Sequence, residues 1–524
     1  MNRVGFWWWR RMASFWVGLG FLLCAGSVVG AGSYNGSIVD VDVEISEGHG
    51  VSVRGDSGSL FGNSLVGIGD INGDGVSDWA CGAPRAAKNG LAYIFFGGKG
   101  ANFNPNRLDG SNGFIVESVT EQALPESMMT GHSVSGVGDV NGDGLDDILV
   151  GSTYNVAEVG KFGHGAAYLI YGRLVFTKPV IEADELRASA SGVRFYCNSA
   201  PQGFGYAVGG GADVNGDGLN DMIIGAPLAD AGSLDDTGVV YVVYGSRFFK
   251  DTYSDTDIVG RVGFSIRGLR QEGSIFGYRV AISPDMNGDG FGEVIVTAPR
   301  AIYPGRVGYP GTFFVLYGTA TPPQSSIDIL DLEEGRGYVV VASRGNTPLL
   351  GCSLAAVGDV NGDGLADVVV GAKKYDYLGI KNAGAVVLVY GTNGSRPFVT
   401  DLFQLDGVNL GAVIPGNEEK LRFGNAVGPG GDMDSDGMQD ILVGSGGIRR
   451  GYLVYGRQGG YETLPSLFTL EGVTQFNSEE RDFASSATTL GDIDDDGNPD
   501  IGFGAWHGDS VYILFGPSNT STVH

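Results

Sequence analysis

The sequence predicts an all-β fold: a seven-bladed β-propeller of four-stranded blades, closed by an N-terminal strand that completes the last blade. Three observations predict it. An aspartate-rich phrase recurs seven times, with its first Asp at residues 70, 139, 213, 285, 359, 432 and 492. Short runs rich in Val, Ile, Tyr and Phe flank each copy and have the length of strands. Glycine, at 91 of 524 residues, suits the many tight turns that short strands need.

Each unit carries the same predicted strands in the same order. Phe-Gly or a relic of it opens the unit, as at Phe204-Gly205, and a first strand then leads into the acidic phrase. The second strand ends in Gly-Ala-Pro or a similar triplet, the third reads YVVYG at 241–245, and the fourth reads GFSIRG at 263–268. The intervals between units are 69, 74, 72, 74, 73 and 60 residues. With no helical spacer, this period indicates blades arranged around an axis.

The two ends of the repeat array predict how the ring closes. GVSVRG at 50–55 is a fourth-type strand that precedes the first unit, whereas only polar residues follow the last third-type strand, YILFG at 512–516. Pairing of these two strands would complete the last blade and remove an exposed sheet edge. The propeller is therefore predicted over 46–516, between a short N-terminal segment at 32–45 and a polar tail at 517–524.

The N-terminus resembles an export signal. Arg3, Arg10 and Arg11 precede an uncharged stretch at 12–33. This arrangement predicts a signal peptide over 1–31. The alternative is an uncleaved anchor, because the uncharged stretch is about 20 residues long and could span a bilayer. Either alternative places the protein outside the cytoplasm, secreted or at the cell surface, and membrane attachment is expected only if the segment is uncleaved.

The formal charge of −27 disfavours unaided binding to nucleic acid or anionic lipid. This acidity is concentrated in the repeated phrase, whose predicted ligand positions hold 23 Asp and Glu side chains and leave a formal charge of −4 for the rest of the chain. No nucleic-acid partner is expected.

The phrase DxNGDGxxD has the chemistry of a calcium loop. Side chains at positions 1, 3, 5 and 9 and the backbone carbonyl at position 7 form an all-oxygen set, which suits a hard cation that takes six to eight ligands. Glycine at position 6 allows the sharp turn. Up to seven structural Ca²⁺ ions are predicted. Their expected ligands are Asp70, Asn72, Asp74, Val76 and Asp78; Asp139, Asn141, Asp143, Leu145 and Asp147; Asp213, Asn215, Asp217, Leu219 and Asp221; Asp285, Asn287, Asp289, Phe291 and Glu293; Asp359, Asn361, Asp363, Leu365 and Asp367; Asp432, Asp434, Asp436, Met438 and Asp440; and Asp492, Asp494, Asp496, Asn498 and Asp500.

The combination of Phe-Gly, the acidic loop and Gly-Ala-Pro in series resembles the FG-GAP repeats of the integrin α-subunit N-terminal propeller, over about 46–516. The resemblance implies an extracellular adhesion or recognition module that binds a protein or glycan ligand on the face opposite the calcium loops. Arg54-Gly55-Asp56 spells a cell-attachment tripeptide, but SVRG aligns with SIRG of the fourth unit, so Arg54 and Gly55 fill a repeat position.

Long, irregular connections are predicted on that opposite face. Their aromatic side chains are the candidate ligand anchors, because Tyr and Trp often dominate interface energy. The alternative is that they cap the ring or pack on neighbouring blades. The candidates are Tyr154, Tyr303, Tyr309, Tyr375, Tyr377 and Trp506.

No catalytic motif appears in the sequence, so the protein is not predicted to be an enzyme. The alternative is a carbohydrate-active or hydrolytic enzyme, or its accessory propeller, which would use the face opposite the calcium loops. Sequons at Asn35, Asn393 and Asn519 are compatible with a glycoprotein. Cys81 and Cys352 lie in apolar stretches and are expected to be core residues without disulfides.

Overall fold

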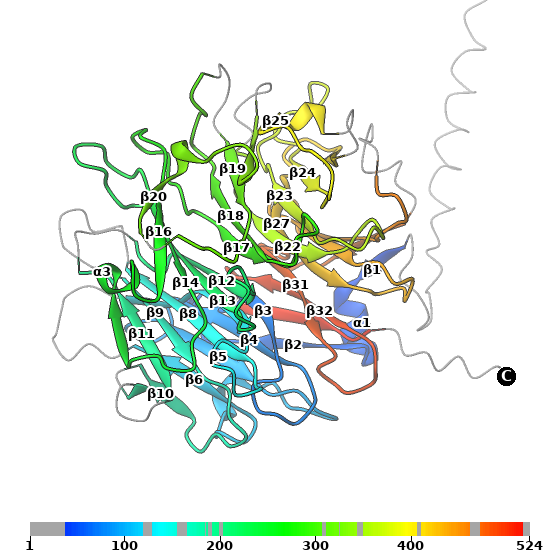
Figure 1. The fold of residues 1–524 in the computed structure, drawn as a ribbon. Coiled ribbons are helices and arrows are strands. Elements are labelled where there is room, and N and C mark those ends of the chain that lie inside the picture. The colour runs from blue at the N-terminus through cyan, green and yellow to red at the C-terminus, as the bar shows by residue number, and fades with distance from the viewer. Residues whose placement is uncertain are drawn as a thin grey trace, which may run out of the picture.

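The computed structural model describes residues 37–118, 128–154, 165–183, 185–186, 191–198, 203–305, 311–323, 325–342, 349–405, 410–461 and 472–516. The predicted signal segment, 1–31, and the polar tail, 517–524, lie outside the described residues. Seven sheets surround a central axis, with the first strand of each blade nearest the centre (Figure 1). The predicted seven-bladed propeller is therefore confirmed.

Each blade contains four antiparallel strands, ordered from the axis outward. They are β3 (Ser64–Gly69), β4 (Asp78–Ala83), β5 (Leu91–Phe95) and β6 (Gly113–Glu117) in blade 1; β7 (Met128–Gly138), β8 (Asp147–Tyr154), β9 (Ala166–Ile170) and β11 (Gly192–Tyr196) in blade 2; β12 (Ala207–Ala212), β13 (Asp221–Ala226), β14 (Val239–Val243) and β16 (Gly263–Arg267) in blade 3; β17 (Val280–Ser283), β18 (Glu293–Ala298), β19 (Thr312–Leu316) and β21 (Gly337–Val341) in blade 4; β22 (Leu354–Gly358), β23 (Asp367–Gly371), β24 (Ala385–Val389) and β26 (Gly411–Pro415) in blade 5; β27 (Phe423–Gly431), β28 (Asp440–Ser445), β29 (Arg450–Val454) and β30 (Val473–Asn477) in blade 6; and β31 (Ser486–Gly491), β32 (Asp500–Ala505), β33 (Ser510–Leu514) and β2 (Gly50–Arg54) in blade 7.

Five blades also carry a short fifth strand, which the sequence analysis did not anticipate. Each of these strands pairs in parallel with the outer edge of one blade. Four of them belong to the connection between strands three and four of the next blade, and the one nearest the N-terminus precedes β2, the fourth strand of blade 7. They are β10 (Val180–Glu182), β15 (Thr252–Ser254), β20 (Ile327–Asp328), β25 (Val399–Asp401) and β1 (Ile38–Asp40), on blades 1, 2, 3, 4 and 6. Runs of two or three residues are too short to show strand alternation in a sequence.

Short helices accompany these connections. They are α1 (Val41–Glu47) after β1, α3 (Asp255–Ile258) after β15, η2 (Ile329–Asp331) after β20, η3 (Leu402–Gln404) after β25, and η1 (Pro105–Arg107) between β5 and β6. A polar side chain caps several of them: Asp40 accepts backbone N–H groups at the start of α1, and Ser254 does so for α3. Four of the short fifth strands therefore lead into a helical turn, and after this turn the chain returns to the blade that contains the following fourth strand.

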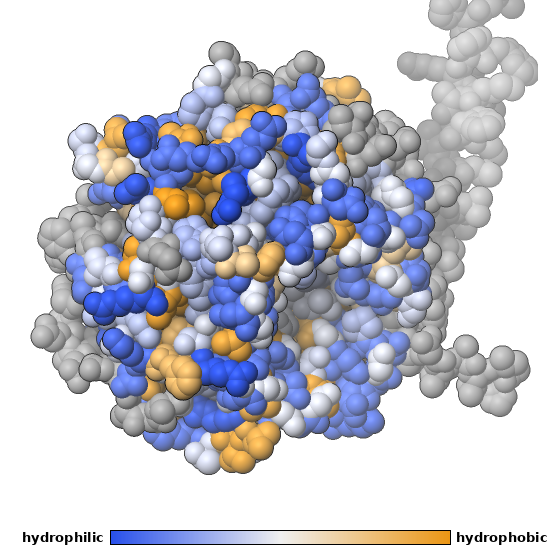
Figure 2. All heavy atoms as spheres, viewed as in Figure 1, coloured by the Kyte–Doolittle hydropathy of each residue, from blue (hydrophilic) through white to orange (hydrophobic). Residues whose placement is uncertain are grey.

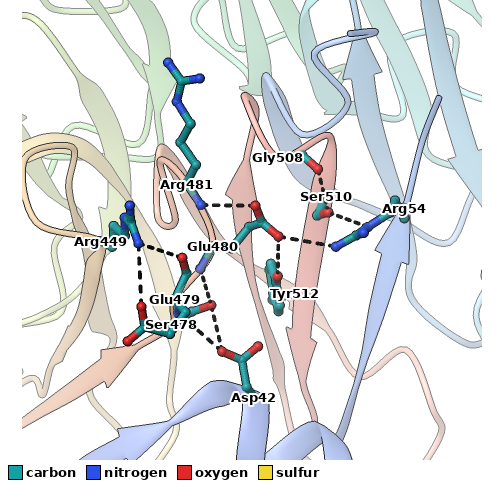
Figure 3. A network of polar contacts seen from close by, with 10 residues as sticks. All are labelled: Asp42, Arg54, Arg449, Ser478, Glu479, Glu480, Arg481, Gly508, Ser510 and Tyr512. Atoms are coloured by element: carbon teal, nitrogen blue, oxygen red, sulfur yellow. Dashed lines mark hydrogen bonds and ion pairs between the residues drawn. The ribbon is translucent and has the colours of Figure 1, made fainter. Parts of the chain in front are cut away.

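Strand β2 closes the ring as predicted. It pairs antiparallel with β33, placing Val51 opposite Ile513, so that the blue N-terminal strand lies beside the red C-terminal strands (Figure 1). Polar contacts support this seam, since the guanidinium of Arg54 lies 3.3 Å from Glu480 Oε2, which also accepts a hydrogen bond from the Tyr512 hydroxyl (Figure 3). Arg54 is thus part of the closure. Strand β1 and α1 show that residues ahead of 46 also pack on the propeller.

The hydrophobic core consists of seven clusters, each between two neighbouring sheets. The phenylalanine of each Phe-Gly pair is fully buried there, as at Phe204. Its glycine must have a positive φ, which is 78° at Gly205, and a Cβ at that position would lie 2.2 Å from the carbonyl oxygen of Ala166. Cys81, Cys197 and Cys352 are buried, and none of them forms a disulfide within the described structure. Outside the core, hydrophilic residues dominate the face shown in Figure 2, with scattered apolar ones.

A repeated serine ties neighbouring blades together near the axis. The hydroxyls of Ser64, Ser133 and Ser353 donate hydrogen bonds of 3.0, 3.0 and 2.8 Å to the carbonyl of the Phe-Gly glycine, or its equivalent, in the next blade. Ser486 of blade 7 makes the same contact with Gly62 of blade 1, across the ring closure. The first strands are therefore joined by side chains as well as by packing.

Candidate metal centres

The acidic loops connect the first strand of each blade to the second and lie together on one face of the ring. In the first loop the carboxylate at position 1 organises the turn. Asp70 Oδ1 accepts a hydrogen bond from Gly73 N at 2.6 Å, and Oδ2 accepts one from Gly75 N at 2.8 Å. Both glycines have positive φ, 75° and 88°. The loop therefore folds around its first aspartate, which places the side chains of later positions on the same side.

The acidic residue at position 9 begins the second strand and is fully buried. In blade 1, Asp78 accepts hydrogen bonds from Ile71 N at 3.1 Å and from Gly97 N, beyond the end of the third strand, at 2.8 Å. The same pair of contacts recurs at Asp147, Asp221, Asp367, Asp440 and Asp500. Burial raises the pKa of Asp78 to about 8. Position 9 therefore joins the loop to the sheet, whether or not it also binds a metal.

The fourth loop differs because its ninth residue is glutamate. Glu293 Oε2 accepts a hydrogen bond from Met286 N at 2.7 Å, whereas Oε1 is buried and has no partner among the described groups. Carboxylate oxygens of Asp285, Asp289 and Glu293 lie within 4.8 Å of one another. Burial, and then repulsion from these two aspartates, raise the pKa of Glu293 to about 9. A buried oxygen without a hydrogen-bond donor beside two carboxylates fits a divalent cation.

Two further loops gather three carboxylates within the same distance. They are Asp432, Asp434 and Asp436 in blade 6, and Asp492, Asp494 and Asp500 in blade 7. In the latter, Asp494 Oδ1 is buried without a described partner. Burial and the neighbouring carboxylates raise the pKa of Asp434 and Asp494. These oxygen-only sets suit a hard cation such as Ca²⁺.

The loops of blades 1, 2, 3 and 5 have asparagine at position 3 and aspartate at position 9. In blade 2, the Asn141 amide donates to Asp143 Oδ2 at 2.9 Å, and Asn361 makes the equivalent contact with Asp363 at 3.0 Å. Among the described residues, these loops do not bring three carboxylates within 4.8 Å. An aspartate at position 3, or the longer glutamate at position 9, is what brings carboxylates together in the other three loops.

On the opposite face, most of the described aromatic candidates pack against the protein. Tyr375 is only 8% exposed, and Tyr377 is stacked on it with ring centroids 6.5 Å apart. Tyr303 is half-buried, with its ring 6.3 Å from that of Phe314. Trp506 lines a pocket at the axis. The side chain of Tyr154 and all of Tyr309 lie outside the described residues.

This axial pocket contains two residues that the sequence analysis missed. It has a volume of ≈450 Å³, and its wall includes Arg279 and Lys373. The seven units themselves indicate Arg279 as unusual. The second residue after Phe-Gly or its equivalent is Ser or Ala in six units, whereas it is Arg279 in the fourth. Comparison of the units at each repeat position would have identified it.

Seven blades, five of them opened by a buried phenylalanine and each with an acidic loop on the same face, define the class as a repeat β-propeller with candidate metal loops. The FG-GAP repeat family model matches residues 130–170, 204–243, 276–316 and 353–389. The chain therefore contains four FG-GAP repeats and is similar to integrin α proteins over part of its length.

Several known proteins are similar to the chain. Integrin alpha pat-2 of Caenorhabditis elegans is 28% identical over 58% of this chain and 22% of its own length. Integrin alpha-7 of Rattus norvegicus is 33% identical over 34% of this chain and 13% of its own. Phosphatidylinositol-glycan-specific phospholipase D of Mus musculus is 29% identical over 37% of this chain and 21% of its own. The matches thus span less than a quarter of each relative. Among the residues that the structure describes, no helix combines the length and apolar character needed to cross a bilayer.

Proposed function

We propose that the chain is an extracellular recognition module, a calcium-stabilised propeller that binds a protein or glycan ligand through the face opposite its acidic loops. The observation that carries the proposal is the division between the two faces. One presents the same acidic loop in every blade, whereas the other presents connections of differing length and sequence around an axial pocket. The similarity to integrin α proteins supports a role in adhesion or recognition.

Calcium is the proposed structural cofactor in up to seven loops, with the ligand positions given by the repeated phrase. The partnerless oxygens Glu293 Oε1 and Asp494 Oδ1 support this proposal most directly. A cation would offset the repulsion within each cluster, which is otherwise a cost to the fold. Bound calcium would supply charge neutralisation and fixed loop geometry, and no catalytic step is assigned to it.

Export is part of the proposal. The predicted signal segment would deliver the propeller outside the cytoplasm, with membrane attachment only if that segment is retained. Asn393 is an exposed sequon asparagine on the loop face, close to Gly288 of the fourth loop, and is a candidate glycosylation site.

An enzymatic or enzyme-accessory role is the second candidate. Its support is the similarity to a phospholipase D, which spans 37% of this chain. Turnover of polysaccharide or phospholipid by the purified chain would favour it over a binding role.

Three measurements on the full chain test the recognition proposal. Titration of chelated protein with Ca²⁺ is expected to raise the melting temperature. A glycan array and capture from cell-surface extracts are expected to yield a ligand that binds in calcium and is lost in chelator. Calcium-independent melting, together with no ligand in either screen, would contradict the proposal.

A further inference from the structure

Two neighbouring pockets on the face opposite the acidic loops have basic walls. The axial pocket, ≈450 Å³, is lined by the first strands of all seven blades. The second pocket, ≈370 Å³, lies beside it at blades 4 and 5 and shares Tyr278, Cys352 and Lys373 with it. None of the described residues that line either pocket is an aspartate or a glutamate. Two adjoining pockets without a described carboxylate are unexpected in a chain with a formal charge of −27.

The basic side chains of these pockets are not held in hydrogen-bonded pairs with described carboxylates, and Arg300 interacts with Asp236 only at longer range. None of them forms an ion pair within the described structure, whereas Arg450, on the same face, lies 2.6 Å from Glu418. Among the described residues, Lys373 Nζ donates a hydrogen bond to a neutral group, Asn425 Oδ1, at 3.4 Å. The five side chains are Arg279, Arg300, Lys373, Lys374 and Arg422. Their positive charge is therefore available to a ligand.

Two of these residues break the repeat. Arg279 is a charged side chain at a position where the other six units have only Ser or Ala, and where Ser64, Ser133 and Ser353 donate hydrogen bonds to the next blade. Lys373 follows Gly-Ala, where three other units have proline. A residue that departs from the pattern of its repeat is typical of a functional position.

A row of stacked groups holds Arg279 in place. The ring centroids of His132 and Tyr206 are 4.5 Å apart, those of Tyr206 and Tyr278 are 5.4 Å apart, and the Arg279 guanidinium lies 4.6 Å from the Tyr278 ring centroid. Arg279 also donates to the Tyr278 carbonyl at 3.0 Å. Its charge lowers the pKa of Tyr278, while burial lowers the pKa of His132 to about 4 and keeps that ring neutral. The positive field of the axial pocket thus comes from Arg279 and Lys373.

We propose that the two pockets together bind a short acidic oligosaccharide, a glycan that carries carboxylate or sulfate groups. The inference deepens the proposed recognition function and rests on it. A planar guanidinium pairs well with such anions, and ring faces beside polar groups suit sugar rings. Volumes of several hundred Å³ are those of small-ligand sites.

The observations favour a glycan over an acidic protein. A protein interface relies on exposed aromatic anchors, but Tyr375 is buried in the core and Tyr303 is half-buried there. The ligand is short because the positive charge is local. Salt screens exposed charges beyond about 8 Å, so a small anion in the pocket is held by its nearest cations, whereas a long polyanion would also meet the acidic remainder of the surface.

The test uses the full chain saturated with Ca²⁺ and measures affinity by calorimetry. The probes are an oligogalacturonate, a heparin-derived hexasaccharide, neutral maltohexaose and a hexaglutamate peptide. The wild type is expected to bind at least one of the two acidic glycans and neither of the other probes. Arg279→Gln/Lys373→Gln should weaken that binding at least tenfold. The control Lys99→Gln/Arg247→Gln removes the same charge on the loop face, where Lys99 pairs with Asp495 and Arg247 lies beside Gly142, and should bind as the wild type does.

A second variant tests the inference without altering Arg279, so that a folding defect of the first variant does not decide the outcome. Arg300→Gln/Arg422→Gln alters only exposed side chains of the second pocket and should weaken binding several-fold. Unchanged affinity in both pocket variants, or binding of hexaglutamate alone, would overturn the inference. Its failure can be told apart from that of the proposed function. A protein that melts higher in calcium but binds neither acidic glycan defeats only this inference, whereas one insensitive to calcium defeats the proposed calcium-stabilised module.

Discussion

The hydroxyl of Ser486, in the last blade, donates a 2.9 Å hydrogen bond to the carbonyl oxygen of Gly62, in the first. The two residues are 424 positions apart in the chain, yet their contact is the same as that between Ser64 and Gly131 in consecutive blades. Because the repeat is identical across the closure, the ring joint uses the same side-chain chemistry as the other interfaces between blades.

Removing this hydroxyl should destabilise the propeller as much as removing it within the array. Ser486→Ala and Ser64→Ala are each expected to lower the free energy of unfolding by about 1 kcal/mol, the usual net value of a hydrogen bond. Urea denaturation measures both, with exposed Ser57→Ala as the unaffected control. A much smaller loss for Ser486→Ala would mean that the closure is looser than the other interfaces.

The closing strand should contribute through its inward face. Val53 is 3% exposed and packs between blades 7 and 1, whereas Ser52 points outward. Val53→Ala is expected to cost about 2 kcal/mol, from lost burial and the cavity left behind. Ser52→Ala should change stability by less than about 0.5 kcal/mol. Equal effects of the two substitutions would argue against the observed register of β2.

The two kinds of acidic position should respond differently to calcium. In chelated protein, Asp221→Ala leaves the Val214 and Gly245 N–H groups without acceptors and should lower the free energy of unfolding by about 2 to 4 kcal/mol. Exposed Asp217→Ala should leave the stability of chelated protein unchanged or raise it, because it relieves repulsion. Both variants should reduce the gain in melting temperature on adding calcium. A stable Asp221→Ala variant in chelator would contradict the structural role of position 9.

Calcium removal should lower the melting temperature by an amount that depends on calcium concentration. If each site binds tenfold more tightly than the ambient level, linkage adds about 1.4 kcal/mol per occupied site. Differential scanning calorimetry in chelator and at increasing Ca²⁺ checks this, with Mg²⁺ as the comparison ion. Identical melting curves in all conditions would count against metal in the loops.

In the loop between β23 and β24 of blade 5, the aromatic side chain should contribute to the stability of the fold. Tyr375→Ala is expected to lower the free energy of unfolding by about 3 kcal/mol, since its ring is packed in the core between blades 4 and 5. Leu378, at the same loop's tip, is 83% exposed, and Leu378→Ala should leave the melting temperature unchanged. A tyrosine variant with wild-type melting and weakened ligand binding would restore Tyr375 as a ligand anchor.

Features encoded by contiguous residues could be predicted from the sequence. A strand, its glycine turn and the acidic loop each depend on about ten neighbouring residues, and their repetition indicated seven blades. The closing strand was predictable for the same reason, because GVSVRG matches the fourth strands of the other units and the last unit lacks one.

Neither the fifth strands nor the burial of Tyr375 could be predicted in this way. β10 and β15 gain their order from pairing with a neighbouring blade, not from their own pattern of two or three residues. Tyr375 stands in a polar, irregular stretch, and only the path of its loop decides that its ring turns inward.

The sequence by itself determined the repeat, the number of blades and the oxygen-bearing side chains of each loop, because each of these is encoded by neighbouring residues within one unit. Only the tertiary structure decided which donors converge and which basic residues share a pocket. Arg279 and Lys373 lie 94 positions apart in the chain, and they come together because blades 4 and 5 are neighbours, so that the start of β17 and the end of β23 border the same pocket.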